Sequence, residues 1–115
     1  MHELSIMSNI LDIVIEHAEA NNAKKVHKIN LKIGLLSDII PEWAQSYFDM
    51  LTKDTIADES ELIIEKVPIK IKCHSCENIF TLEDKTMNFF CNKCKSTDIE
   101  ILSGRELQIT SIEID

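Results

Sequence analysis

The sequence predicts an α+β fold: two helices on a small mixed sheet of about three strands, with an inserted four-cysteine, zinc-ribbon-like module. Three observations support this prediction. Apolar residues recur at helical spacing in residues 4–20 and again after Pro41. Residues 28–35 alternate between apolar and polar side chains, as a half-buried strand does. All four cysteines lie in two Cys-x-x-Cys pairs between residues 73 and 94.

Two segments have the pattern of amphipathic helices. The apolar stripe of residues 4–20 consists of Leu4, Met7, Ile10, Leu11, Val14 and Ala18. The second helix is expected to begin at Pro41, because proline donates no N–H and loses nothing in a first turn. We expect its face with the single tryptophan, Trp43, to be buried in the core. The other members of that face are Tyr47, Met50 and Leu51.

Three extended segments follow the pattern of strands. In residues 28–35 the apolar positions 29, 31, 33 and 35 share one face, and Gly34 marks a bulge or turn near the end. Residues 62–73 are extended, and Pro68 interrupts them at the expected boundary of the cysteine module. Residues 107–114 form a last strand whose inward positions shift phase near Thr110, which indicates a bulge or bend.

The cysteine module therefore stands between two strands of the sheet. We expect a discontinuous α+β base domain, residues 1–70 plus 104–115, and a zinc-binding module of residues 71–103. The strands on either side of the module are expected to join the sheet that residues 28–35 begin.

The four cysteines predict a metal site. Cys73 and Cys76 form one pair and Cys91 and Cys94 the other, and two such pairs place four thiolates around one point. A site without an open coordination position is structural, and zinc suits four thiolates without redox chemistry. Apolar residues between the pairs are expected to cover the sulfurs: Phe80, Leu82, Phe89 and Phe90.

Two alternatives remain for these cysteines. They could form two disulfides, although paired cysteines more often bind metal in a cytoplasmic protein. They could also hold iron, as in rubredoxin-like centres. Against iron, Glu77 and Lys95 follow the pairs at positions where glycine would let backbone amides approach the sulfurs.

The first residues, Met1-His2-Glu3, offer a second candidate metal site. The His2 imidazole, the terminal amine and a backbone amide can chelate a metal that accepts square-planar geometry, such as Ni(II) or Cu(II). Glu3 adds a carboxylate, or simply favours the start of the helix that follows. On its own this motif is weak, because a histidine at position two is usually a solvated terminus.

Composition excludes several classes of protein. The net charge is −8, and residues 1–67 carry six lysines against twelve acidic residues. Residues 68–104 are neutral, with five lysines against five acidic residues, so no basic stripe for nucleic acid is present. The start lacks the pattern of a signal peptide, and no apolar run approaches the roughly 20 residues that span a membrane. We expect a cytoplasmic protein that binds neither nucleic acid nor membrane.

The whole chain resembles the HypA/HybF family, the nickel-insertion accessory proteins of nickel–iron hydrogenase maturation. The residues that carry this resemblance are Met1-His2-Glu3, Glu16-His17-Ala18, Cys73/Cys76 and Cys91/Cys94, in an order of helix, strand, helix and strand. The combination is much more specific than any one of these motifs.

The resemblance implies a metallochaperone that holds Ni(II) through His2, backbone nitrogens and Glu3, beside a structural Zn(II) bound by the four cysteines. It implies a HypB-like GTPase and the hydrogenase large-subunit precursor as partners, with urease accessory proteins as further partners in some members. A monomer or weak homodimer is expected. In some members a histidine follows each cysteine pair and exchanges as a zinc ligand. Here Glu77 and Lys95 occupy those positions and His74 lies inside the first pair, so that exchange is not carried over.

The residues favour a carrier over an enzyme, because no nucleophile–base pair, phosphate-binding loop or carboxylate dyad stands in a suitable context. The alternative function is a zinc-ribbon adaptor that binds nucleic acid or the transcription machinery. An electron carrier with iron in the four-thiolate site is a third hypothesis.

Overall fold

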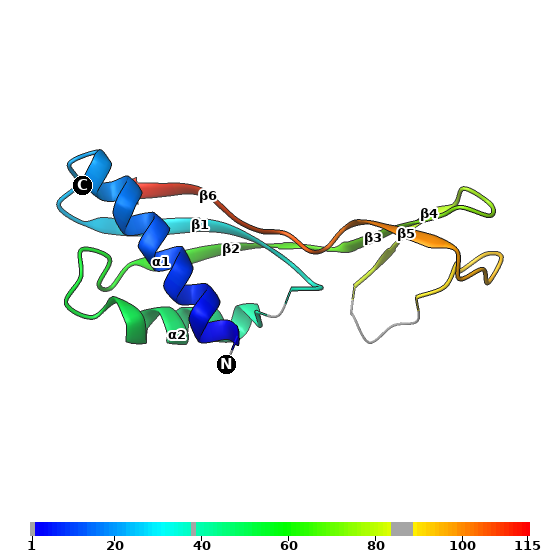
Figure 1. The fold of residues 1–115 in the computed structure, drawn as a ribbon, viewed down its shortest axis with the longest axis horizontal. Coiled ribbons are helices and arrows are strands. Elements are labelled where there is room, and N and C mark those ends of the chain that lie inside the picture. Colours follow the sequence, from blue (N-terminus) through cyan, green and yellow to red (C-terminus); the bar gives the residue numbers. More distant parts are fainter. Residues whose placement is uncertain (1, 38, 84–88) are drawn as a thin grey trace. The chain divides into compact units, whose positions relative to one another are not determined.

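The computed structural model describes residues 2–37, 39–83 and 89–115, apart from the side chain of His2 (Figure 1). The elements in chain order are α1 (His2–Ala20), β1 (Val26–Gly34), α2 (Pro41–Thr52), β2 (Glu61–Val67), β3 (Ile69–Cys73), β4 (Ile79–Leu82), β5 (Ile99–Ser103) and β6 (Leu107–Ile114). The predicted α+β class is confirmed. Among the described residues no helix is both long and apolar enough to cross a membrane.

The chain divides into two compact units. The first consists of Met1–Lys32, Asp38–Glu65 and Gln108–Asp115, and the second of Ile33–Ser37 and Lys66–Leu107. The first unit carries both helices, and the second carries all four cysteines.

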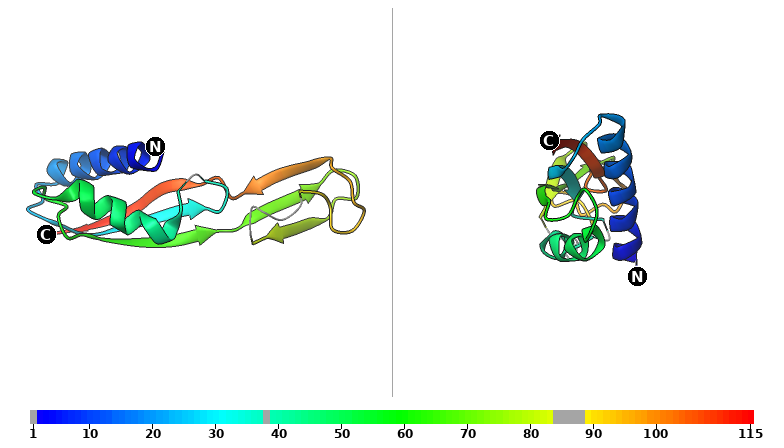
Figure 2. Two further views of the ribbon diagram at one scale, coloured as in Figure 1. Left: turned by 90° about the horizontal axis from the view of Figure 1, so that it is seen from below. Right: turned by 90° about the vertical axis from the view of Figure 1, so that its left-hand side faces the viewer.

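One three-stranded sheet has the order β2-β1-β6, so the strands on either side of the cysteine segment join the sheet of β1, as predicted, and both lie next to β1. Backbone bonds from Lys24 N to Asp115 O (2.9 Å) and from Gly34 N to Glu106 O (2.7 Å) show that β1 and β6 are antiparallel. The arrows of β1 and β2 point the same way in Figure 2, with α2 as the crossover between them. The sheet is therefore mixed.

The core of the first unit lies between the helices and one face of this sheet. The predicted stripe of α1 is buried at Met7, Ile10, Leu11, Val14 and Ala18. Val26, Ile29 and Leu31 of β1 are buried as well, whereas Lys28 between them is exposed. Figure 2 shows both helices on the same side of the sheet, which leaves the polar side chains of β1 on the other side.

The predicted burial of Trp43 is wrong. Its side chain is 55% exposed and that of Met50 is 60% exposed, whereas Ala44 and Phe48 are fully buried. The exposed face with Trp43 and the buried face with Ala44 are rotated from each other by about 100° around the helix axis, which is the angle between successive residues. The sequence pattern favoured the face with the larger aromatic residues, but the small side chain of Ala44 lets the other face approach the core closely.

The second unit contains a separate antiparallel sheet of order β4-β3-β5. Its core includes two of the cysteines, and the members are Ile69, Ile71, Cys73, Phe80, Leu82 and Cys91, with Phe89 and Ile99 packed against them. Of the residues expected to cover the sulfurs, Phe80 and Leu82 share this core with Cys73 and Cys91 and Phe89 packs against it, whereas Cys76 and Cys94 stay exposed. Phe90 is half-buried, and the Lys95 ammonium lies 5.2 Å from the centre of its ring.

The two glycines of the chain meet in the second unit. A Cβ atom at Gly34 would collide with the backbone carbonyl of Gly104, and Leu36 N donates to that carbonyl at 2.7 Å. Gly104 has φ +121°, which side-chain-bearing residues rarely adopt. Gly34 therefore serves a close approach of two backbone segments, which the single-strand pattern could not indicate.

Substitution of the two large aromatic residues of α2 distinguishes its two faces. Phe48→Ala removes a fully buried ring, and we expect it to lower the free energy of unfolding by about 3–5 kcal/mol. Trp43→Ala removes an exposed ring, and we expect a change within about 0.5 kcal/mol. Urea melts followed by far-ultraviolet circular dichroism measure both values. A larger loss for Trp43→Ala than for Phe48→Ala would contradict this assignment of the core.

Candidate metal centre

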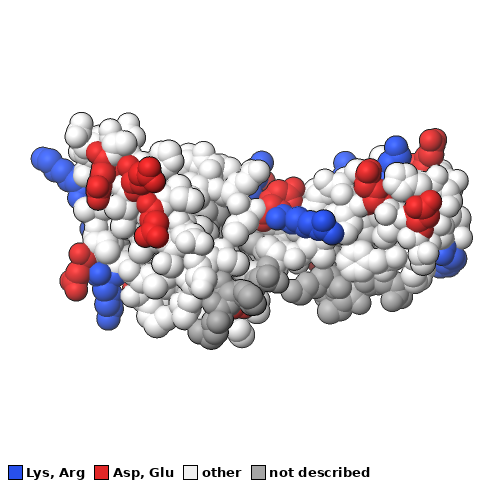
Figure 3. All heavy atoms as spheres, in the orientation of Figure 1, with Lys and Arg blue, Asp and Glu red and all other residues white. Residues whose placement is uncertain are grey.

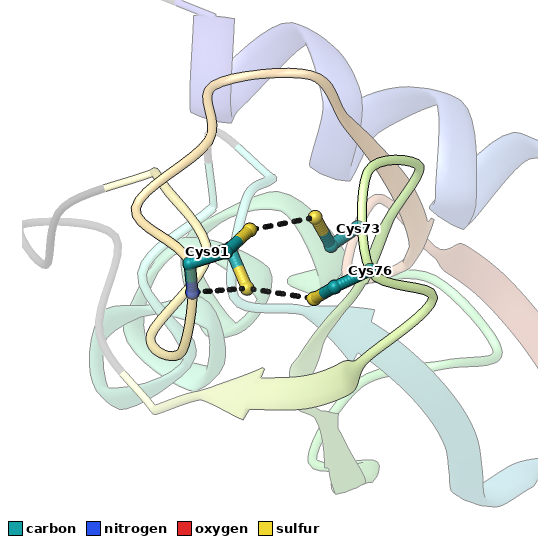
Figure 4. A group of neighbouring side chains, drawn as sticks. Cys73, Cys76 and Cys91 are labelled. Atoms are coloured by element: carbon teal, nitrogen blue, oxygen red, sulfur yellow. Dashed lines mark hydrogen bonds between the residues drawn. The ribbon is translucent and has the colours of Figure 1, made fainter.

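The four cysteines come together at one end of the β4-β3-β5 sheet. Cys73 is the last residue of β3, Cys76 lies in the turn after it, and Cys91 and Cys94 lie in a second turn before β5. Their four sulfur atoms all lie within 4.8 Å of one another. Figure 4 shows the sulfurs of Cys73, Cys76 and Cys91 pointing toward one another. Cys73 and Cys91 are buried, whereas Cys76 and Cys94 are exposed.

The sulfur separations fit one tetrahedral metal ion. Cys73 Sγ lies 3.6 Å from Cys94 Sγ, and Cys76 Sγ lies 3.6 Å from Cys91 Sγ. Four sulfurs at about 2.3 Å from a central zinc ion would be about 3.8 Å apart. A disulfide needs a separation of about 2.05 Å, and all four cysteines are free. The disulfide alternative therefore does not fit this structure.

The two turns that carry the cysteine pairs have the same backbone design. Cys73 N donates to Asn78 O at 2.8 Å, and Cys91 N donates to Ser96 O at 2.9 Å. The residue after each pair is left-handed, with φ 62° at Glu77 and 64° at Lys95. A side-chain-bearing residue in this conformation costs about 1–2 kcal/mol relative to the usual backbone region.

The residues after the pairs do not keep backbone amides from the sulfurs. Lys93 N and Cys94 N donate to Cys91 Sγ at 3.4 and 3.5 Å. The sequence argument against iron assumed that Glu77 and Lys95 would prevent such approaches. The left-handed turns allow these approaches without glycine, so Glu77 and Lys95 do not disfavour iron in the four-thiolate site.

Polar side chains connect the two turns, and the sequence analysis missed them. Ser75 Oγ and Ser96 Oγ are 2.9 Å apart. Asn78 Nδ2 donates to Asn92 Oδ1 at 2.7 Å and also lies 3.9 Å from Cys91 Sγ. The available signal was the small polar residue two positions after each cysteine pair, Asn78 and Ser96. These contacts orient the turns and hence the sulfurs, as second-shell partners do in metal sites.

The pKa values of the Cys91 and Cys94 thiols are shifted in opposite directions. The backbone N–H of Cys94 lowers the pKa of Cys91 to about 6, against the effect of burial and with help from the N–H of Lys93. The Ser96 backbone lowers the pKa of Cys94, but burial and the sulfurs of Cys73, Cys91 and Cys76 outweigh it and raise this pKa to about 12. Neighbouring thiolates repel one another, so all four ionise together only around a cation.

The N-terminal candidate site lies mostly outside the described residues. Met1 and the side chain of His2 belong to the part that is not described. Glu3 is half-buried in the first turn of α1, in the first unit. The predicted grouping of His2 with Glu3 therefore stays a prediction.

Fold and site together define a small α+β metal-binding protein whose second unit is built around a four-thiolate site. Three further findings specify the class. A family model described as "Hydrogenase/urease nickel incorporation, metallochaperone, hypA" matches residues 1–114. The hydrogenase maturation factor HypA of Caldanaerobacter subterraneus is 38% identical over 116 residues, with 100% of both chains covered. That of Wolinella succinogenes is 36% identical over 116 residues, covering 100% of this chain and 96% of its own.

Two solved structures share the fold. A solution structure of the Ni metallochaperone HypA from Helicobacter pylori has a TM-score of 0.63 at 25% identity, covering 97% of this chain and 96% of its own. A second solution structure of a HypA protein has a TM-score of 0.68 at 25% identity, covering 99% and 96%. The chain belongs to the HypA family of hydrogenase/urease nickel-incorporation metallochaperones, and it is not an enzyme.

The left-handed residue in the first turn can be tested by substitution. Glu77→Gly removes the steric cost of a positive φ, whereas Glu77→Val adds a β-branched side chain there. We expect the glycine variant to retain bound metal at least as well as the wild type. The valine variant should be less stable by more than about 1 kcal/mol. Metal transfer to a colorimetric chelator, followed over time, compares them.

The control is His74→Val, because His74 is exposed in the same turn and its φ is not positive. Equal metal retention by Glu77→Val and His74→Val would show that the backbone conformation of residue 77 does not matter for the site.

Proposed function

We propose that this chain is a nickel carrier for the maturation of nickel–iron hydrogenase. It binds Ni(II) at Met1-His2-Glu3 and passes the ion to the hydrogenase large-subunit precursor, while the four cysteines hold a structural Zn(II). The observation that carries this proposal is the match of the nickel-incorporation family model to residues 1–114. Membership of that family supports a carrier over the zinc-ribbon adaptor and over the electron carrier.

The start of α1 supports a nickel site at the N-terminus. The helix begins at His2, and the first N–H groups of a helix have no partner within it. The backbone amide of His2 is therefore available to a metal together with the terminal amine and the imidazole. Glu3 lies in the same turn and can add a carboxylate. Protons compete for these nitrogens, so nickel affinity falls as the pH falls.

We assign the two metals to different parts of the chain. We assign nickel to residues 1–70 plus 104–115 and zinc to residues 71–103, although the compact units group residues 33–37, 66–70 and 104–107 with the cysteines. The division of the chain into a helix-bearing unit and a cysteine-bearing unit supports separate sites. A carrier gains from this separation, because nickel can bind and leave without disturbing the metal that holds the fold of the second unit.

The proposed partners follow from the same family. A HypB-like GTPase and the hydrogenase large-subunit precursor are the main ones, and urease accessory proteins are further candidates, because the family description names both hydrogenase and urease. We propose that the chain is a monomer or weak homodimer. We place it in the cytoplasm, where four free thiols persist and remain available to metal.

Cys91→Ser tests the four-cysteine site. The purified wild type should contain one equivalent of zinc and be colourless, because zinc thiolate does not absorb visible light. The variant should lose zinc and the ordered amide signals of residues 73–82, while α1 and β1 keep theirs, because their core lies in the first unit. Elemental analysis and two-dimensional NMR measure these effects.

His74→Ala is the matched control, since His74 is exposed in the first turn and should not affect the metal. A full equivalent of zinc in Cys91→Ser would refute the four-cysteine ligand set. A red protein with one equivalent of iron would establish the iron centre instead.

His2→Ala tests the nickel site. Calorimetric titration of untagged, zinc-loaded protein with Ni(II) should show one nickel per chain, and the substitution should abolish it while zinc stays bound. His27→Ala is the control, because His27 is a histidine of the first unit with a 48% exposed side chain that lies outside the terminal motif. Unchanged nickel binding in His2→Ala would separate the Met1-His2-Glu3 motif from the function.

A further inference from the structure

The outer face of α2 carries large apolar side chains that the first unit does not cover. Ile40, Trp43 and Met50 are 38%, 55% and 60% exposed, and Tyr47 between them is half-buried. We call these residues the α2 stripe. Trp43, Tyr47 and Met50 fall within about 60° of arc on the helix, so they form one continuous surface. Tryptophan, tyrosine and methionine are among the residues enriched where proteins bind other proteins.

An acidic hollow of about 660 Å³ adjoins this stripe in the same unit. Four carboxylates line it, from Asp49, Asp58, Glu59 and Glu61, against a single cation, Lys53. Lys53 of the hollow follows Met50 of the stripe by three residues, a spacing that makes side chains neighbours at the end of α2. The hollow and the stripe are thus neighbouring parts of one surface.

Hydrogen bonds hold the wall of the acidic hollow in place. Gln45 Nε2 donates to Asp49 Oδ1 at 2.8 Å and to Ser60 O at 3.1 Å. The Leu62 backbone N–H donates to Gln45 Oε1 at 2.8 Å. The side chain of Gln45 therefore ties α2 to the segment that leads into β2. A binding surface with fixed groups loses less conformational freedom when a partner binds.

The charge of the first unit selects the kind of partner. Both helices carry only acidic charged residues besides histidine: Glu3, Asp12, Glu16 and Glu19 on α1, and Glu42 and Asp49 on α2. Figure 3 shows acidic side chains gathered over α1 on the face in view. A surface of this sign attracts cationic partners and repels acidic ones.

We propose that the α2 stripe and the acidic hollow form one docking surface for a cationic amphipathic helix of a partner protein. The apolar stripe of the partner helix packs on Trp43, Tyr47 and Met50, and lysines or arginines along one of its flanks enter the hollow. A second copy of this chain is a poor occupant, because two-fold pairing of the stripe brings two acidic hollows close together. The surface lies in the first unit, whereas the four-cysteine site lies in the second.

Model peptides test this surface on the full-length, zinc-loaded protein. The probe is a fluorescein-labelled helical peptide of about 14 residues, roughly the 20 Å length of α2, with a leucine stripe, lysines along one flank and glutamine elsewhere. The matched peptide has glutamate in place of each lysine. We expect the lysine peptide to bind at least about tenfold more tightly than the glutamate peptide, a difference of about 1.4 kcal/mol. Added salt should weaken its binding.

Trp43 reports on the site directly, because it is the only tryptophan of the chain. The lysine peptide should shift its emission to shorter wavelength as the ring leaves water. Met50→Glu and the double variant Asp58→Lys, Glu59→Lys should each weaken peptide binding at least about tenfold. Ile79→Glu is the control, because Ile79 is 51% exposed in the second unit, and its binding should match the wild type.

Several results would overturn the proposal. Equal binding of the lysine and glutamate peptides would show adsorption without charge recognition. Wild-type binding by Met50→Glu, with an unchanged thermal melt, would remove the stripe from the interface; Met50→Gln would serve if the glutamate variant unfolds. Self-association that sedimentation detects in the wild type and that Met50→Glu abolishes, without any effect on peptide binding, would show that a second copy covers this face.

Discussion

The repulsion among four thiolates is the constraint on which the second unit depends. Sulfur atoms within 4.8 Å of one another cannot all ionise without a cation between them. Cys73 and Cys91 also belong to the small apolar core of that unit, beside Ile69, Ile71 and Phe80. A core of this size does not stabilise a fold by burial alone. A metal ion held by the four sulfurs would complete this core and join the turn after β3 to the turn before β5.

Two left-handed residues bring a local steric cost to the turns that carry the cysteines. Glu77 and Lys95 both adopt a positive φ, at about 1–2 kcal/mol each. In the second of these turns the backbone amides of Lys93 and Cys94 donate to the sulfur of Cys91. That arrangement stabilises the thiolate, which is the form that binds metal. The turns therefore carry a steric cost in the backbone, while their amides stabilise Cys91 in the thiolate form.

The first unit has different properties, which fit a carrier that meets other proteins. Its helices are acidic, and α2 leaves Trp43 and Met50 in solvent while Phe48 fills the core. A helix that buried its largest aromatic residue would be more stable but would have no apolar surface to offer. Exposed tryptophan on a structured helix is consistent with a surface that a partner covers. The chain belongs to a family of nickel-incorporation metallochaperones, and the delivery of nickel to another protein that we propose would use such a surface.

The sequence by itself determined the two helices, the strands β1, β2 and β6, and the four cysteines that could hold a metal, but not the separate β4-β3-β5 sheet. The stripe of α1, the alternation of β1, the break at Pro68 and the spacing of the four cysteines are local patterns, and the local chain decides them. Only the tertiary structure decided which face of α2 is buried, because Ala44 and Trp43 are one residue apart and the packing surface chooses between them. It also decided the close approach of the backbone at Gly34 and the contacts of Ser75 and Asn78 between the two turns. The hydrogen bonds that backbone N–H groups donate to Cys91 Sγ likewise depend on the folded structure. Each of these contacts joins segments that are far apart in the chain or depends on particular backbone angles. The periodicity of a single segment predicts neither of these.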